Sequence, residues 1–141
     1  ALEGLPEYFK LDSFRVLDER RWNARGQLIT LSEATIKVEV KGNKIMTVAE
    51  GNGPVNALDN ALRKALSPAF EELADMRLVD YKVRILTPSQ GTKAVTRVVI
   101  ESTDGEGERW STVGVSANVI DASFNALNDA ITYKLYRSGA K

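Results

Sequence analysis

The chain has 141 residues, of which 43% are hydrophobic and 27% are charged, and this composition is typical of one globular domain with a sizeable core. Its 19 basic residues equal its 19 acidic residues, so no net charge favours nucleic acid or an anionic membrane as a partner. The absence of cysteine and histidine excludes disulfides, thiolate chemistry, the usual general base near neutral pH and the commonest transition-metal ligand.

The first part of the chain predicts a linker followed by a strand. Residues 1–10 contain a glycine and a proline and show no hydrophobic period, so we expect a linker or docking arm in a chain that continues upstream. From Leu11 onward, Phe14 and Val16 alternate with polar neighbours, which predicts a strand. The stretch 15–25 is so highly charged that this strand is expected at an edge or partly exposed.

A hairpin and a helix are predicted next. Residues 35–40 alternate cleanly, and residues 45–50 pair back across a turn at Gly42-Asn43, where either residue tolerates positive φ. Pro54 suits the first turn of a helix, because its absent N–H would have no partner there. Two sets of apolar residues are expected to face the core: Ile36, Val38 and Val40 of the strand, and Leu58, Ala61, Leu62, Ala65 and Leu66 of the helix.

The second half repeats this order. Ser67-Pro68 interrupts the first helix, and residues 70–76 predict a second short one. Further elements follow by the same criteria: strands over 78–87, 94–101 and 109–115, a turn around Asp104-Gly105, and a helix over 118–136 with Ile120, Phe124, Leu127, Ile131 and Leu135 on its inner stripe. Every long helix follows a hairpin, which predicts an α+β fold with helices packed on antiparallel sheets.

Two stretches of the chain are related copies. Residues 34–62 and 94–127 each contain a strand, a tight turn, a strand, a glycine-bearing loop and a helix. Asn60-Ala61-Leu62 aligns with Asn125-Ala126-Leu127. The repeat predicts two pseudo-symmetric units, one about 11–76 and the other about 77–141, with a ligand site where the halves or two chains meet.

The glycine-bearing loops are the candidate binding elements. Paired glycines in Gly51-Asn52-Gly53-Pro54 let backbone amides approach a ligand, and a helix N-terminus favours an anion. A strand-to-helix turn that requires positive φ is the simpler interpretation of this loop. In the matching loop with Gly114, Ser116 or Asn118 is a good helix N-cap. Two such loops brought together by pseudo-symmetry would form a site for one small anion.

Several other side chains favour structural interpretations. Trp22 and Trp110 are expected to be packing residues rather than ligand contacts, and Tyr81 to lie in the core or at its rim. The arginines of stretch 15–25 are expected to form a solvated face. The acidic residues Glu71, Glu72, Asp104 and Asp121 show no spacing typical of a metal site. We therefore expect no catalytic, cofactor or metal site in this chain. No apolar run is long enough to span a bilayer, so we expect no membrane partner and a cytoplasmic location.

From Leu11 onward the chain resembles the C-terminal regulatory domain of the 2-isopropylmalate synthase and citramalate synthase family, known as the LeuA dimer domain. The segments that carry the resemblance are Gly51–Ala57, Leu78–Tyr81, Gly91–Thr92 with Ala94 and Arg97–Val98, and Trp110–Ser116 with Asn118–Ile120. The strand Asp80–Leu86 favours the citramalate synthase branch.

The resemblance implies an allosteric regulatory domain over 11–141, built from two βββα units and forming a homodimer. It implies feedback inhibition by a branched-chain amino acid of an enzyme that condenses acetyl-CoA with a 2-oxo acid on a separate TIM-barrel domain. Isoleucine is the expected effector, and a leucine-sensing 2-isopropylmalate synthase domain is the alternative. The implied effector-binding residues are Gly51, Gly53, Pro54, Val55, Asn56, Leu78, Tyr81, Ile85, Thr92, Ala94, Asn118 and Val119.

Three other hypotheses remain open. The chain could be a dimerisation module without a small-molecule ligand, an amino-acid sensor of the ACT type for another enzyme, or an independent enzyme. Titration with branched-chain amino acids separates the first of these from an effector-binding domain.

Overall fold

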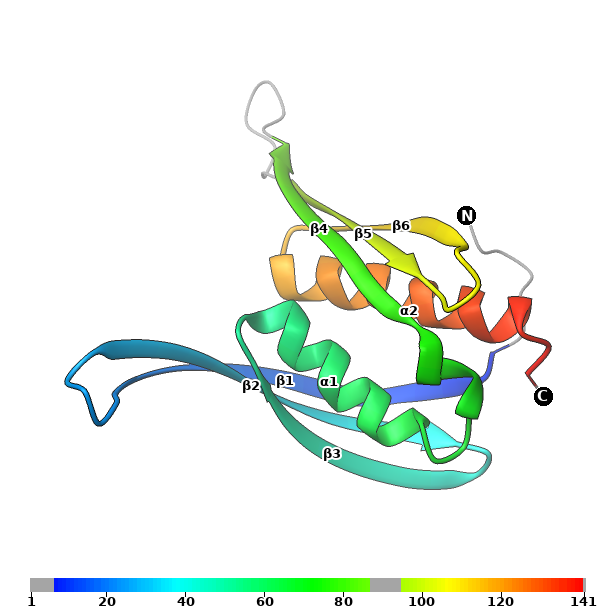
Figure 1. The fold of residues 1–141 in the computed structure, drawn as a ribbon, viewed down its shortest axis with the longest axis horizontal. Helices are drawn as coiled ribbons and strands as arrows, with labels where there is room; N and C mark the ends of the chain where they lie inside the picture. The colour runs from blue at the N-terminus through cyan, green and yellow to red at the C-terminus, as the bar shows by residue number, and fades with distance from the viewer. Residues whose placement is uncertain (1–6, 87–94, 141) are drawn as a thin grey trace. The chain divides into compact units, whose positions relative to one another are not determined.

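The computed structural model describes residues 7–86 and 95–140, which form two compact units, one of residues 7–69 and the other of residues 70–86 with 95–140 (Figure 1). Each unit is a three-stranded antiparallel sheet followed by an α-helix, in the strand orders β1-β2-β3 and β4-β5-β6. This confirms the α+β fold of two βββα units. The elements are β1 (Phe9–Trp22), β2 (Leu28–Val40), β3 (Asn43–Gly51), α1 (Pro54–Leu66), the 3₁₀ helix η1 (Glu71–Asp75), β4 (Arg77–Leu86), β5 (Val95–Thr103), β6 (Arg109–Ser116) and α2 (Val119–Arg137).

In the first unit, α1 packs on β2 and β3 (Figure 1). The strand residues predicted to face the core, Ile36, Val38 and Val40, are buried, as are all five predicted core residues of α1. The Thr47 hydroxyl also donates to the carbonyl oxygen of Ala61 at 2.7 Å. Apolar burial and this strand-to-helix hydrogen bond together fix the helix on its sheet.

In the second unit, α2 packs on β5 and β6 in the same way. The Thr112 hydroxyl donates to the carbonyl oxygen of Ala126 at 2.7 Å, which repeats the first unit's bond at the aligned positions. Of the predicted inner stripe of α2, all but the half-buried Ile120 are buried. A Cβ atom on Gly114 would collide with the carbonyl oxygen of Ala122. The glycine is therefore required by the close approach of the helix backbone to β6.

The β2–β3 turn lies one residue earlier than predicted. Positive φ occurs at Lys41 (50°) and Gly42 (83°), while Asn43 already pairs with Val40 as the first residue of β3. A two-residue hairpin loop whose central residues both have positive φ matches the right-handed twist of the strands. The prediction identified the hairpin correctly and its central pair incorrectly.

The two tryptophans lie in different environments. Trp110 packs as predicted: its indole N–H donates to the carbonyl oxygen of Ala130 at 3.2 Å, and its ring centroid is 5.4 Å from that of Tyr133. Trp22, at the end of β1, is 70% exposed, so the packing role predicted for it is wrong. The charged strand over 15–25 is at the edge of its sheet as predicted, as the outer end of β1. The sequence did not reveal that β2 begins at Leu28 and pairs with β1 past the end of β3, where no third strand or helix of the described unit covers them.

Candidate functional site

A β-bulge places the three predicted effector-binding residues of β4, Leu78, Tyr81 and Ile85, on one face of the strand. Leu78 pairs with Ser102, whereas Asp80 pairs with Glu101, so Val79 is an extra residue in the strand. Without the bulge, residues 78 and 81 would point to opposite faces, because side chains alternate along a strand. With it, Leu78, Tyr81 and Ile85 all face the side on which α2 packs.

This face of β4 remains open although it carries apolar side chains. The helix packs mainly on β5 and β6, and Tyr81 and Ile85 are 41% and 66% exposed. The Tyr81 hydroxyl lies 3.5 Å from the Ser123 hydroxyl of α2. We call Leu78, Tyr81, Val83 and Ile85 the β4 strip. The strip is an accessible apolar surface next to a helix.

The reason for glycine in the loop before α1 differs from the predicted one. Gly53 has an extended φ of −168°, and Gly51 is not among the residues with positive φ. A Cβ atom on Gly51 would collide with the backbone nitrogen of Ala57 and would lie 2.6 Å from the Asn56 Oδ1. Gly51 is therefore needed for close approach of strand and helix, and the expectation of positive φ is wrong.

Asn56 holds this loop in place. Its Oδ1 accepts hydrogen bonds from the Asn52 amide at 3.1 Å and from the Asn60 side-chain amide at 3.5 Å. Asn60 also donates to the carbonyl oxygen of Glu50 at 3.0 Å. The acceptor capacity of Asn56 is thus already used within the loop.

The two long helices begin differently. The N-cap of α1 is Gly53, which has no side chain to cap the first-turn amides, so that end retains its preference for an anion. The N-cap of α2 is Asn118, whose Oδ1 accepts from the amides of Ile120 and Asp121 at 2.7 and 3.3 Å. The predicted capping role of Asn118 is confirmed, and Val119 is the first residue of α2.

The predicted effector residues fall into three groups. Gly51, Gly53, Pro54, Val55 and Asn56 belong to the first unit, while Leu78, Tyr81, Ile85, Asn118 and Val119 belong to the second. Thr92 and Ala94 lie outside the described residues. That these groups form one effector site stays a prediction.

The second unit has a surface hollow of about 460 Å³ that is lined mostly by charged side chains. There the buried Lys134 ammonium lies 2.9 Å from Asp75 and 3.9 Å from Asp104. The hydrogen bond from Lys134, aided by one from the Gly105 amide, lowers the pKa of the Asp75 carboxyl. These pairs connect η1, the β5–β6 turn and α2. Among residues 7–86 and 95–140, no three acidic side chains are grouped so that they could hold a metal ion.

In the first unit, burial raises the pKa of the Asp59 carboxyl, and the neighbouring Arg63, whose Nε donates to Asp59 at 2.8 Å, partly offsets this. The contact is an i,i+4 pair within α1.

In the part of the chain that the structure describes, no helix is long and apolar enough to cross a membrane.

Comparison with known proteins identifies relatives along nearly the whole chain. It is 54% identical over 138 residues to the (R)-citramalate synthase of Geobacter sulfurreducens, and 52% identical over 138 residues to that of Streptomyces coelicolor. These matches cover 98% and 97% of the chain but 25% of each relative. The 2-isopropylmalate synthase of Aquifex aeolicus is 30% identical over 131 residues, which cover 93% of the chain and 24% of that enzyme.

The chain thus spans about a quarter of the length of these relatives, and it is more similar to the citramalate synthases than to the 2-isopropylmalate synthase. Both kinds of synthase contain a segment that matches both βββα units. Residues 2–135 match the LeuA allosteric (dimerisation) domain, and the chain belongs to that family.

Proposed function

We propose that this chain is the amino-acid-sensing domain of a citramalate synthase and that it mediates feedback inhibition by a branched-chain amino acid. The observation that carries the proposal is the β4 strip, an open apolar face that the bulge at Val79 assembles from Leu78, Tyr81 and Ile85. The family is an allosteric one, and the citramalate synthases of Geobacter sulfurreducens and Streptomyces coelicolor share more than half of the aligned residues with this chain. The condensation of acetyl-CoA with a 2-oxo acid would take place on the TIM-barrel domain, outside this chain.

The chemistry of the β4 strip suits the tail of a branched aliphatic amino acid. Aliphatic and aromatic side chains offer apolar area to such a tail, and the Tyr81 hydroxyl adds one polar group at the edge. The uncapped start of α1 is the element of the first unit best suited to a carboxylate, because its first-turn amides lack a side-chain acceptor. The ammonium group of the effector needs acceptors other than Asn56, whose Oδ1 is already engaged.

Isoleucine is the proposed effector, with leucine as the alternative. The two amino acids contain the same atoms, so apolar area does not distinguish them, and the preference depends on the shape of the pocket. A misfit of one methylene is worth about 1–3 kcal/mol, which is roughly five- to 150-fold in affinity. Inhibition then requires only that the effector bind two states of the whole enzyme with different affinity, typically by about 1–3 kcal/mol.

The chain is further proposed to form a homodimer, as the family of dimerisation domains suggests. Light scattering after size exclusion should give twice the mass of the chain at micromolar concentration. A monomer both with and without the effector would contradict this part of the proposal.

Calorimetric titration of the chain with isoleucine, leucine and alanine tests the proposed ligand. We expect saturable binding of isoleucine, weaker binding of leucine and no measurable heat with alanine, which lacks the apolar tail. Tighter leucine binding would transfer the proposal to the 2-isopropylmalate synthase branch. No binding of either branched amino acid would refute the sensing function.

A second candidate is a dimerisation module without a small-molecule ligand. The hydrogen bonding of Asn56 and Asn118 favours it, because both side chains already have partners within their own loops. Under this candidate the β4 strip would be covered by protein, and the titrations would give no heat at all.

A further inference from the structure

The β1–β2 hairpin ends in an arm that we define as residues 19–31. The last residue of β3, Gly51, lies opposite Ser32, and beyond that point β1 and β2 pair with each other alone, from Glu19 with Leu31 to Trp22 with Leu28. Four such pairs extend the hairpin by about 13 Å. In Figure 1 the arm projects past the end of β3. A two-stranded ribbon is marginally stable in water, so an arm of this kind gains most from a partner.

The turn of the arm is well formed. The backbone amide of Asn23 donates to the Gln27 carbonyl oxygen at 2.9 Å, and the Asn23 Oδ1 accepts from the amides of Arg25 and Gln27, each at 2.9 Å. Gly26 supplies the positive φ of 75° that closes the loop. The loop therefore holds the tip of the arm in one conformation.

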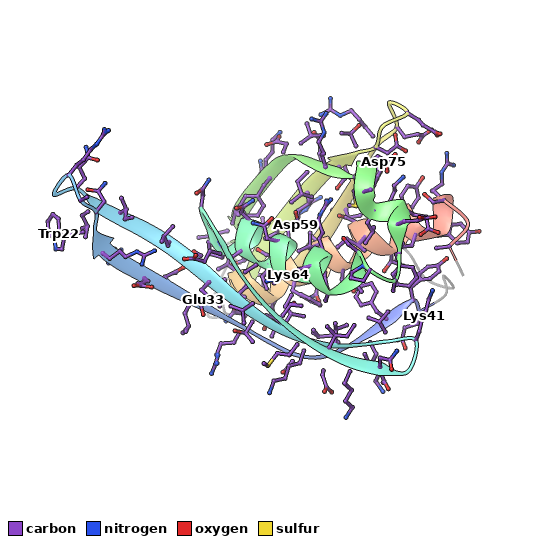
Figure 2. All side chains as sticks on the ribbon, turned by 60° about the horizontal axis from the view of Figure 1, so that its bottom comes forward. Trp22, Glu33, Lys41, Asp59, Lys64 and Asp75 are labelled. Atoms are coloured by element: carbon purple, nitrogen blue, oxygen red, sulfur yellow. The ribbon has the colours of Figure 1, made fainter. Side chains whose placement is uncertain are left out.

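The tip presents a cross-strand apolar pair to solvent. Trp22 and Leu28 lie directly opposite each other and are 70% and 55% exposed. Figure 2 shows Trp22 at the far end of the hairpin. Exposed tryptophan is unusual on a free surface, and tryptophan is among the residues that contribute most to binding at protein interfaces.

The charge of the arm differs from that of the rest of the chain. Residues 19–31 contain Arg20, Arg21 and Arg25 against Glu19, a net charge of +2, which leaves 16 basic and 18 acidic residues elsewhere, a net charge of −2. Among the described residues, Arg21 approaches Glu50 at 3.8 Å, whereas Arg20 and Arg25 form no ion pair. An arm would therefore be repelled by a second arm and attracted by the remainder of a second chain.

We infer that the arm is a dimer contact, which packs its Trp22–Leu28 tip and its arginines on the body of a second copy of this chain. The inference rests on the homodimer proposed above and names the element that makes it. In a twofold dimer each arm contacts the other chain's body, so the contact occurs twice and the assembly closes. This contact covers the apolar tip and places the positively charged arm on a body of opposite net charge.

Tryptophan fluorescence tests this contact directly. In a Trp110→Phe variant, Trp22 is the only tryptophan, so the emission reports Trp22 alone. If Trp110→Phe folds poorly, the difference between the emission spectra of the native chain and of Trp22→Phe reports the same residue. We expect the emission of Trp22 to move to shorter wavelength as the concentration rises through the dimerisation midpoint. A dimer by light scattering in which Trp22 emission stays that of an indole in water would overturn the inference.

Substitution measures the strength of the contact. Trp22→Ala should raise the dimer dissociation constant at least tenfold in sedimentation equilibrium, while circular dichroism stays native because the side chain is largely exposed. Tyr136→Ala, at a 51% exposed position on α2, is the matched control and should leave dimerisation unchanged. Native dimerisation of Trp22→Ala refutes the arm as a contact. A native chain that is monomeric at every concentration also refutes it, while calorimetry with isoleucine still decides the sensing function independently.

Discussion

Replacing Tyr81 by alanine is the sharpest test of the β4 strip. Tyr81 is 41% exposed, and a tyrosine has about 200 Å² available for burial, so a ligand can cover about 80 Å² of it. At about 25 cal/mol per Å², full coverage contributes about 2 kcal/mol to binding. We therefore expect Tyr81→Ala to weaken isoleucine binding by roughly 30-fold.

The buried part of Tyr81 makes a control for stability necessary. Because alanine also removes packing within the second unit, isoleucine is titrated by calorimetry at a temperature at which circular dichroism shows the variant to be fully folded. Tyr81→Phe keeps the ring and loses a hydroxyl that lies 3.5 Å from the Ser123 hydroxyl, at the limit of a hydrogen bond. Its affinity should stay within about threefold of the native value.

A second control is provided by Tyr136→Ala, which removes another exposed tyrosine of the same unit outside the β4 strip and should bind isoleucine as the native chain does. Native affinity in folded Tyr81→Ala would show that the ligand does not touch this ring. That result would leave Tyr81 a structural residue and refute the reasoning.

Three further predictions concern the glycines and the ionic cluster. Gly114→Ala should lower the free energy of unfolding by about 1–3 kcal/mol in urea titrations, because the Cβ of the new alanine would collide with the carbonyl oxygen of Ala122. A variant as stable as the native chain would contradict this close packing. Gly53→Ser adds an N-capping side chain to α1 at an unobstructed, extended position, so it should raise the free energy of unfolding by about 0.5 kcal/mol. The new hydroxyl would also occupy the first-turn amides and should weaken isoleucine binding. Unchanged affinity for isoleucine would show that this helix start is not part of the site. Since the hydrogen bond from Lys134 lowers the pKa of Asp75 below 3.8, its stabilisation is complete above about pH 5 and lost as pH falls below about 4. Asp75→Asn should therefore flatten the acid limb of the stability profile, and a profile identical to the native one would rule this contribution out.

The sequence already contains the information for the fold class and the repeat. Alternation in residues 35–40 and the 3.6-residue period after Pro54 specify a strand and a helix by local chemistry alone, and both faces proved to be the buried ones. Helix capping is equally local, so Asn118 could be predicted from its position before an apolar-periodic segment. The resemblance that identified the family depends on the same short segments, and the comparisons confirm it.

Features that depend on partners distant in sequence were missed or misplaced. Gly51 and Gly53 were expected to adopt positive φ, yet Gly51 is required because a helix backbone passes close to it, and no local pattern reports that distance. The charged edge strand over 15–25 was predicted, but the start of β2 at Leu28, well before residue 35, was missed for a related reason. Strand length is set by pairing with a neighbour, and the charged composition of residues 15–25 does not reveal it.

Residue identity determined which side chains could line a site, and tertiary structure decided which of them share a face. Leu78 and Tyr81 are three positions apart, so alternation alone would separate them, and only the bulge at Val79 in the pairing with β5 brings them together. Trp22 is apolar in any context, but the register of β1 on β2 decides that it ends exposed at the tip of an arm. A sequence fixes the chemistry of each side chain, whereas its direction along a strand depends on hydrogen bonds to another strand, and these form only when the chain has folded.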